Sequence, residues 1–461
     1  MRQWRPHAFL LLVIIAAFLL APRAADATPG FARQTGVACE ACHTVFPELT
    51  PFGRLFKLNG YVFSNVRQLQ DINVNRETTL ALAEAAPLSV QLEASNTTLS
   101  KRIPDAAVND ASQKNATQFP QALSLFYTGK IADNLGAFLQ LTWSPATNSV
   151  GIDNSDLRFA DHGTFPSVGV PDFIYGLTLN NNPTSQDVWN STPAWGYPFI
   201  TTVAGVNNDA KTQIDGTLAQ TSAGLGGYLW INNHLYLEVT GYRSAQTGTK
   251  NSVTGNVGPL DSTTANRING VAPYWRVGWE QDWQRNSFFI GTFGLRDATH
   301  PAGIGENGPA DTFTDYGFDA QYQYIGDNHI FSIYATWIHE HQDRNTANGT
   351  AANATDRLDT ARLTGSYFYN RKIGGSVQIF STTGTSDPGL FVAAPVIGSA
   401  AGKPDTQGAI FELDYLPWLN TKLGVQYTAF RKFNGATSNY DGFGRNASDN
   451  NTLFVFVWTA F

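Results

Sequence analysis

Short runs in which hydrophobic and polar residues alternate fill the chain from about residue 87 to its end. In residues 314–324, Thr, Tyr, Phe and Ala occupy every second position, with Asp, Gly and Gln between them, and residues 422–430 repeat the pattern. Successive side chains of a β-strand point to opposite faces, so such a strand has one face suited to lipid and one suited to water. A soluble β-sandwich produces the same alternation, so the number of strands and their connections must distinguish the two folds.

The alternation predicts sixteen antiparallel strands, an even number, as in bacterial outer-membrane barrels. The expected strands span residues 87–100, 119–131, 135–145, 154–162, 171–180, 212–231, 234–246, 268–283, 286–299, 311–325, 328–343, 355–371, 373–386, 405–417, 420–433 and 450–461. Two kinds of connection alternate along the chain. Short ones lie at 232–233, 284–285, 326–327 and 417–418, and long polar loops lie at about 101–118, 181–211, 247–267, 387–404 and 434–449. Such barrels have short periplasmic turns and long extracellular loops, so both chain ends are expected in the periplasm. The last strand ends on an aromatic residue, Phe461, as outer-membrane insertion signals do.

Residues 1–27 have the pattern of a secretory signal peptide. Arg2 and Arg5 precede an apolar run at residues 8–21, and the small residues Ala25 and Ala27 form a cleavage site. The run is short for a membrane span, which favours cleavage over an uncleaved N-terminal anchor. Charged residues make up only 15% of the chain, yet no apolar run after residue 27 reaches the length of a transmembrane helix.

The two cysteines of the chain, Cys39 and Cys42, lie three positions apart and are followed at once by His43. This C-x-x-C-H sequence is the attachment motif of c-type haem. Two thiols on one turn of backbone can add to the two vinyl groups of one haem, and the adjacent imidazole can bind the iron as its proximal ligand. A disulfide, a thioredoxin-like redox pair and a zinc site are the alternatives. Covalent haem is favoured, because the chain shows neither a thioredoxin-like βαβ context nor further zinc ligands at short spacing.

The residues after this motif predict a small helical unit. Thr50 suits the N-cap position, Pro51 suits the first helical position, and Asn59-Gly60 is a natural helix stop. About fifty residues form too small a core to bury a porphyrin, whereas a sixteen-stranded barrel has a lumen wide enough for a plug. We therefore expect a signal peptide at 1–27, an α-helical monohaem cytochrome c segment at 28–86 that plugs the lumen, and an all-β outer-membrane barrel at 87–461.

With this motif inside residues 31–63, followed by a barrel of about 380 residues, the chain resembles the fused monohaem cytochrome–porin family, whose members include outer-membrane iron oxidases of iron-oxidising bacteria. The likeness is motif-specific only over residues 31–63; the barrel matches in architecture. The resemblance implies one covalently attached haem c, with thioether bonds to Cys39 and Cys42 and with His43 as the proximal ligand of the haem iron. It also implies oxidoreductase activity, in which extracellular Fe(II) is oxidised and the electron passes to a periplasmic carrier such as a soluble cytochrome.

The sixth ligand of the iron is left open by the sequence. Met1, the only methionine, leaves with the signal peptide, so the mature chain cannot form the Met/His pair of many cytochromes c. Six further histidines are expected at the rims of the barrel: His162, His234 and His329 near periplasmic turns, and His300, His339 and His341 near outer loops. His339 and His341 share a strand face and could bind a surface metal, but a rim role is favoured.

Acidic residues outnumber basic ones, 37 to 30, for a formal net charge of −7, and nothing here suggests a nucleic-acid partner. The lumen face is expected to carry Glu93, Glu238, Glu280, Asp282, Asp315, Asp319, Glu412 and Asp414 against the bases Arg276, Arg362 and Lys422. An acidic lumen attracts cations, and oxygen ligands suit ferrous or other divalent ions. The simpler interpretation, which we favour, is that these acids pair with basic residues of the plug: Arg33, Arg54, Lys57 and Arg67.

Three functions fit these features. The first is an electron conduit in contact with outer-membrane lipid that oxidises an extracellular donor, with Fe(II) as the favoured donor. The second is the same conduit serving a different extracellular shuttle or cytochrome. The third is a diffusion porin whose haem plug is structural or sensory. An open pore would favour the third function, and a plugged barrel would favour the first two.

Overall fold

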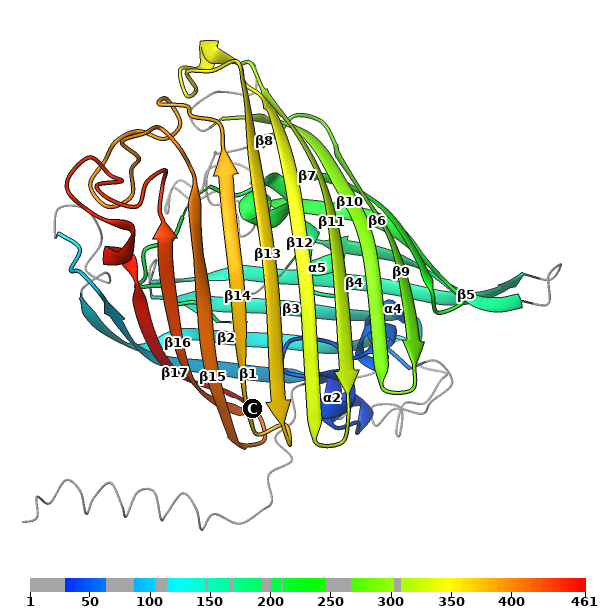
Figure 1. Cartoon of the computed structure of the whole chain (residues 1–461). Helices are drawn as coiled ribbons and strands as arrows, with labels where there is room; N and C mark the ends of the chain where they lie inside the picture. The colour runs from blue at the N-terminus through cyan, green and yellow to red at the C-terminus, as the bar shows by residue number, and fades with distance from the viewer. Residues whose placement is uncertain are drawn as a thin grey trace, which may run out of the picture.

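A single antiparallel sheet that closes on itself dominates the computed structural model (Figure 1), which describes residues 30–63, 87–104, 114–145, 148–165, 170–192, 200–208, 210–245, 267–301 and 308–461. Strand β1 (Leu88–Leu99) pairs with the last strand, β17 (Thr452–Ala460), from Gln91 opposite Ala460 to Leu99 opposite Thr452. This pairing leaves the sheet without a free edge, as a strand structure in a bilayer requires.

The remaining strands follow one another around the barrel in chain order. They are β2 (Asn115–Ala132), β3 (Leu135–Ser144), β4 (Ser149–Phe165), β5 (Val170–Asn180), β6 (Ser222–Ile231), β7 (Leu235–Ser244), β8 (Arg267–Ile268), β9 (Ala272–Trp283), β10 (Asn286–His300), β11 (Asp311–Ile325), β12 (His329–Asp343), β13 (Thr355–Tyr369), β14 (Ile373–Gly384), β15 (Thr406–Trp418) and β16 (Thr421–Lys432). The two-residue β8 pairs with the same strand as β9, so it continues β9 beyond an irregularity at 269–271. Counted in this way, the described residues form sixteen strands, which confirms the predicted number.

The two faces of the wall have opposite chemistry, as the alternation predicts. On β15, Phe411 and Leu413 are 47% and 71% exposed on the outside, whereas Glu412 and Asp414 between them are buried inside. The stretches at 314–324 and 422–430 show the same division. An apolar outer face and a polar inner face are the features of an outer-membrane barrel.

Short turns gather at one end of the barrel, the end at which the C-terminus also lies (Figure 1). Asn232 and Asn233 link β6 to β7 with φ of 56° and 57°, the left-handed conformation that tight hairpins require. The short connection predicted at 417–418 was wrong: Trp418 still pairs with Thr421, and the turn consists of residues 419–420.

The connection between β5 and β6 folds into the barrel instead of lying outside it. Residues 181–192 are buried throughout, and Trp189 stacks on Phe289 of the wall with 3.7 Å between ring centroids. The predictions of an outer loop at 181–211 and of a strand from residue 212 were therefore wrong. Residues 212–221 precede the strand, which begins at Ser222, and include the short helical turn η2 (Gln213–Thr217). The polar wall explains the burial, because it supplies hydrogen-bond partners to a loop that would otherwise need water.

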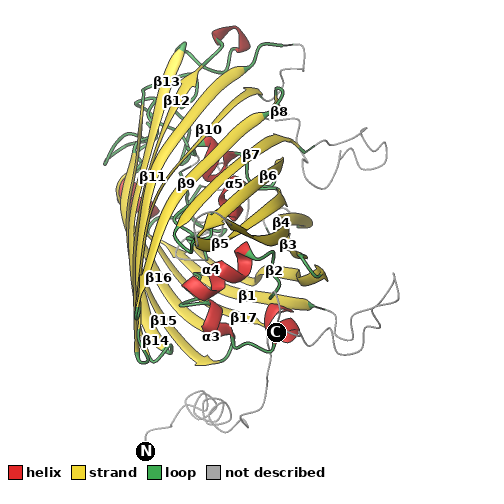
Figure 2. Ribbon diagram, turned by 90° about the vertical axis from the view of Figure 1, so that its right-hand side faces the viewer, coloured by secondary structure: helices red, strands yellow, loops and turns green. Residues whose placement is uncertain are grey.

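Three short helices precede the barrel: α2 (Gly30–Thr35), α3 (Cys39–Cys42) and α4 (Pro51–Leu58). They lie at the short-turn end, with α4 beside the inner side of the wall (Figures 1 and 2). The start and stop of α4 confirm the sequence prediction: the Thr50 hydroxyl accepts a hydrogen bond from the Gly53 amide at 3.1 Å, and the helix ends before Asn59. No helix within the described ranges is both long and apolar enough to cross a bilayer.

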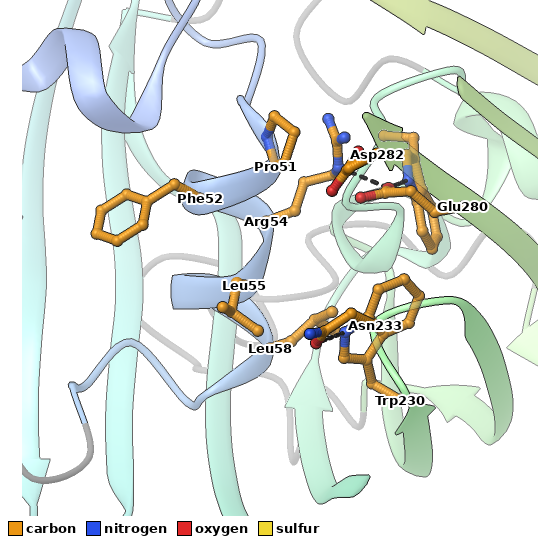
Figure 3. A pocket seen from close by; sticks show the side chains of 10 residues that line it. Pro51, Phe52, Arg54, Leu55, Leu58, Trp230, Asn233, Glu280 and Asp282 are labelled. Atoms are coloured by element: carbon orange, nitrogen blue, oxygen red, sulfur yellow. Dashed lines mark hydrogen bonds and ion pairs between the residues drawn. The ribbon is translucent and has the colours of Figure 1, made fainter. Parts of the chain in front are cut away.

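Arg54 attaches α4 to three strands of the wall, and Figure 3 shows its contact with Glu280 of β9. Its guanidinium is 2% exposed, forms an ion pair with Glu280 at 2.9 Å, and donates to Gln323 at 2.8 Å and to Ser287 at 2.7 Å. The expected pairing between a plug base and a lumen acid is thus confirmed for Arg54. The side chain fixes the height and rotation of α4 against β9, β10 and β11.

The other charged side chains of the lumen do not form the expected pairs between plug bases and wall acids. Arg33 and Lys57 donate to the carbonyl oxygens of Leu88 and Ser185, and Arg67 lies outside the described residues. Most predicted lumen acids are buried, but several pair with bases of the barrel itself: Asp319 with Arg276, and Glu412 and Asp414 with Lys422. Asp282 is exposed at the end of β9.

The outer face provides a test of membrane insertion. Ile379→Arg, at the middle of β14, should destabilise the inserted barrel by about 2–4 kcal/mol, because the guanidinium would face hydrocarbon. Val392→Arg is the matched control, since Val392 is equally exposed, at 59%, but lies in a loop. Urea unfolding of both variants in lipid vesicles measures the difference. Equal stabilities would contradict a lipid-facing position for Ile379.

The buried ion pair between Arg54 and Glu280 provides a second test. Arg54→Ala should lower the free energy of unfolding by about 3–5 kcal/mol, because it leaves the Glu280 carboxylate buried without its cation. The exposed pair of Arg285 with Asp327, at 2.7 Å, is the control, and Arg285→Ala should change the stability little, because water screens an exposed ion pair. Denaturant titration gives the free energies, and limited proteolysis shows whether residues 30–63 become accessible. Equal losses in the two variants would show that Arg54 does not anchor α4.

Candidate functional site

The two cysteines occupy the single turn of α3, on the inner side of the barrel rim. Cys39 and Cys42 are half-buried and are not joined by a disulfide. The sulfur of Cys39 lies 3.7 Å from the side-chain oxygen of Asn420 in the β15–β16 turn. The structure therefore brings both thiols to one helical turn next to the wall, in agreement with the sequence spacing.

Tight packing against α4 holds this turn in place. A Cβ on Gly53 would come within 2.2 Å of the carbonyl oxygen of Cys42, so only glycine permits the approach. The amide of Thr50 donates to the same carbonyl at 2.9 Å, and its hydroxyl donates to the carbonyl of Ala41 at 2.6 Å. These contacts fix the direction in which α3 presents its side chains.

His43 is positioned as a neutral imidazole with one ring nitrogen engaged. Its Nδ1 lies 3.2 Å from the carbonyl oxygen of Pro47 and donates to it, which leaves Nε2 free of the proton. Burial lowers the pKa of His43 to about 4, so the ring is neutral near neutral pH. Histidines that bind metals usually donate their second nitrogen in this way. The geometry of His43 fits an axial ligand of haem iron.

The thiols themselves are poorly suited to redox exchange. Burial raises the pKa of Cys42 to about 11 and also raises the pKa of Cys39. Reactive cysteine pairs have lowered pKa values, because the thiolate is the attacking form. This environment argues against a thioredoxin-like role for the pair.

Aromatic side chains next to the motif are only partly covered by the residues that the structure describes. The ring of Phe46 lies 4.8 Å from that of His43 and 5.1 Å from that of Trp458, yet Phe46 is 38% exposed. Phe52, on α4, is 43% exposed. Large apolar groups on the inner side of a barrel are normally covered, so these faces suit a flat apolar cofactor.

A cavity of about 170 Å³ lies between α4 and the wall (Figure 3). Leu55 and Leu58 line one side, and Trp189, Trp230 and Glu280 line the other. Pockets for small ligands begin at about 300 Å³, so this cavity is too small for a porphyrin. It is a packing gap between the helix and the β5–β6 connection, whose described residues (181–192, 200–208 and 210–221) form the inward loop.

The other histidines occupy the rims, as expected. His234 and His329 lie at short turns, where their Nδ1 atoms bond the Glu280 carbonyl and the Tyr367 hydroxyl, both at 2.8 Å. His162 is on β4, close to its last residue, and His300 ends β10. On β12, His339 contacts Asp359 at 2.7 Å and His341 contacts Asp343 at 3.1 Å. The described part of the chain contains no group of three or more His, Cys, Asp or Glu side chains arranged to hold a metal ion.

Two neighbours of the motif were not anticipated from the sequence. The Pro47 carbonyl orients His43, and the guanidinium of Arg371, from the β13–β14 turn, donates to the His43 carbonyl at 3.3 Å. A proline four residues after the histidine is a local signal that could have suggested the first contact. No local signal marks Arg371, because it is 328 residues away.

Comparison with known proteins finds similar folds but no relative by sequence. No known protein family matches the chain, and no curated protein does. Similar solved structures include the outer membrane channel DcaP of Acinetobacter baumannii, with a TM-score of 0.44 and 12% identity over 81% of this chain and 96% of that chain. Salmonella typhi OmpF in complex with daunomycin has a TM-score of 0.44 and 11% identity over 81% of this chain and 97% of that chain. The trimer form of OmpT of Vibrio cholerae has a TM-score of 0.42 and 12% identity over 81% of this chain and 98% of that chain. The chain is similar to these outer-membrane proteins in fold alone.

Proposed function

We propose that the protein is an outer-membrane electron conduit that carries one covalently bound haem c. Cys39 and Cys42 would form the thioether bonds, and His43 would bind the iron through Nε2. The observation that carries the proposal is the hydrogen bond from His43 Nδ1 to the Pro47 carbonyl, beside two thiols on a single turn. When bound, the haem supplies a one-electron carrier.

The surroundings of the motif support a role in holding such a group. Gly53 and Thr50 fix the turn that bears the thiols, and Phe46 and Phe52 offer uncovered apolar faces. The barrel wall buries one face of α4, on which Arg54, Phe56 and Leu58 are at most 6% exposed. A low-polarity surrounding can keep the potential of a haem high in the absence of a methionine ligand.

The contents of the lumen favour a conduit over an open channel. Residues 30–63 contact the wall at the short-turn end, and the inward loop contacts it further along. Charged side chains on the inner face, such as Arg276, Glu238 and Asp319, are at most 3% exposed, whereas an open pore would leave them in water. A filled lumen of this kind would hinder the passage of solutes.

The favoured donor is extracellular Fe(II), and the acceptor is a soluble periplasmic cytochrome. In the proposed orientation, the short turns and both chain ends lie in the periplasm and the long loops lie outside, as in other outer-membrane barrels. Haem near the periplasmic rim would then be close to the acceptor. A different extracellular shuttle or cytochrome in place of iron would require the same arrangement.

A diffusion porin is the second candidate. The observation that favours it is the barrel itself, because porins have sixteen to eighteen strands and an aqueous channel. In that case the segment around Cys39 would be a structural or sensory plug. Conductance distinguishes the two candidates.

Haem attachment is the first test. The double variant Cys39→Ala with Cys42→Ala should insert as a barrel but lose covalent haem, because no thiol remains to form the thioether bonds. Peroxidase staining of denaturing gels and heat-modifiable migration measure the two properties. Glu40→Gln is the control, since Glu40 lies between the cysteines but its side chain is 67% exposed. Haem staining of the double variant at the wild-type level would exclude the proposed site.

Electron transfer is the second test. Haem-loaded protein in sealed vesicles should be reduced by Fe(II) added only on the side of the long loops, and in planar bilayers it should show low ionic conductance. The absorption band of reduced haem reports the first property. A large, steady conductance without haem reduction would instead establish the porin function.

A further inference from the structure

Exposed charged side chains are divided unevenly between the two ends of the barrel. Among the described residues, the short-turn end has two exposed bases, Arg285 and Lys372, and four exposed acids: Glu40, Asp133, Asp282 and Asp327. The end with the long loops has one exposed acid, Asp343, and eight exposed bases: Lys101, Arg102, Lys114, Lys211, Arg243, Arg296, Arg357 and Arg431. The long-loop end therefore favours contact with anions.

Two of these bases, Arg296 and Arg357, stand on the outer face of the wall near the long-loop ends of β10 and β13. The neighbours of Arg296 in the chain, at 295 and 297, are 2% and 3% exposed, and those of Arg357, at 356 and 358, are 6% and 3% exposed. Because successive side chains of a strand alternate between faces, buried neighbours on the inside place both guanidinium groups on the outside.

The strand register places these two arginines at one level. Arg296 is opposite Thr314 on β11, Thr314 is opposite His341 on β12, and His341 is opposite Arg357 on β13. The four strands are neighbours in the wall (Figure 1). Three strand spacings of about 4.8 Å separate the two arginines, or about 14 Å. We call these four residues the outer row.

Aromatic side chains lie directly below the outer row, on the side of the short turns. Tyr316 and Phe318 on β11 and Trp337 on β12 are 43%, 57% and 36% exposed on the outer face. Phe318 stacks on Trp337 with 6.1 Å between ring centroids, and Tyr316 lies 5.7 Å from the same indole. Aromatic girdles mark the two interfaces of an outer-membrane barrel, so the outer row lies just beyond one of them.

The distance from the middle of the wall gives the same depth. Leu363, which is 46% exposed, is opposite Ile379 at mid-wall, and Arg357 follows six positions away on the same face of β13. Six residues span about 20 Å along a strand, or about 15 Å across the membrane at a tilt of about 40°. Half of the apolar band is about 12 Å, so the guanidinium group reaches the headgroups.

The acids on this part of the outer face are already engaged. Asp359 is contacted by His339 at 2.7 Å, and Asp343 is contacted by His341 at 3.1 Å. Within the part of the chain that the structure describes, neither Arg296 nor Arg357 forms an ion pair with an acid. Both guanidinium groups can therefore bind an external anion, and their planar fork fits the oxygens of a phosphate group.

We propose that Arg296 and Arg357 bind phosphate groups of lipopolysaccharide, an anionic glycolipid of the outer leaflet. The aromatic side chains below them would contact its acyl chains. Free phosphate fits less well, because the outer row is an open surface beside the hydrocarbon and encloses no pocket for a small ion. The proposal rests on the orientation given under the proposed function, with the long loops outside, and it does not depend on the haem.

Titration of lipopolysaccharide into the full chain in neutral detergent tests the proposal. The double variant Arg296→Gln with Arg357→Gln should bind about 30-fold more weakly than the wild type, because each base near an anionic lipid surface raises the affinity about fivefold. Arg296→Lys with Arg357→Lys should keep most of the affinity, since the charge remains. Dephosphorylated lipopolysaccharide should bind the wild type weakly. Heat-modifiable migration verifies that each variant is folded.

Arg285→Gln with Lys372→Gln is the matched control, because it removes the same charge at the short-turn end and should bind lipopolysaccharide like the wild type. Equal losses in the two glutamine variants, undiminished binding of the dephosphorylated lipid, or equally tight binding of inorganic phosphate would each overturn the proposal. Haem staining and reduction by Fe(II) are measured separately. Lost lipid binding with intact haem reduction would refute the lipid site alone, and the reverse result would refute the conduit alone.

Discussion

A strand that crosses a bilayer must pair all its backbone N–H and C=O groups with neighbouring strands, because lipid offers no hydrogen bonds. The rest of this structure depends on that requirement. It is met only when β1 joins β17, and the closed ring that results has an apolar outer face and a polar inner one. Sixteen strands enclose more space than wall side chains can fill. The inward loop and the N-terminal helices occupy much of that space, at different heights.

Buried charges determine how these internal parts fit together. Arg54 with Glu280, and Arg276 with Asp187 and Asp319, connect an internal segment to the wall in places where water is excluded. Such pairs contribute little net stability, since desolvation costs about as much as the attraction returns. Their geometric demands are strict, however, because an ion pair that is displaced leaves a bare charge. They therefore define position more than they add strength.

The alternation of residues was sufficient to predict the barrel and its number of strands, because each strand carries its own two-residue period. The capping residues of α4 were equally local, so Thr50 and Pro51 located its start, and the spacing of Cys39 and Cys42 placed both on one turn. The inward loop was missed because its many polar residues are typical of a solvated loop. Its partners, such as Glu340 and Asp315, are more than a hundred residues away. The two-residue alternation reports which face of a strand a residue occupies, but it gives no information about a contact between residues so far apart in the sequence.

Arg54 and its partner Gln323 are separated by 269 positions, and the two strands that close the ring stand at opposite ends of the barrel sequence. The helical segment is made early, yet the strands that receive it are made late. Until they arrive, its aromatic side chains and Arg54 have no wall to contact, and long-range contacts of this kind form slowly. The segment must therefore be kept in a soluble, unaggregated state during assembly and must be in place when the ring closes, since a closed wall gives α4 no lateral route of entry.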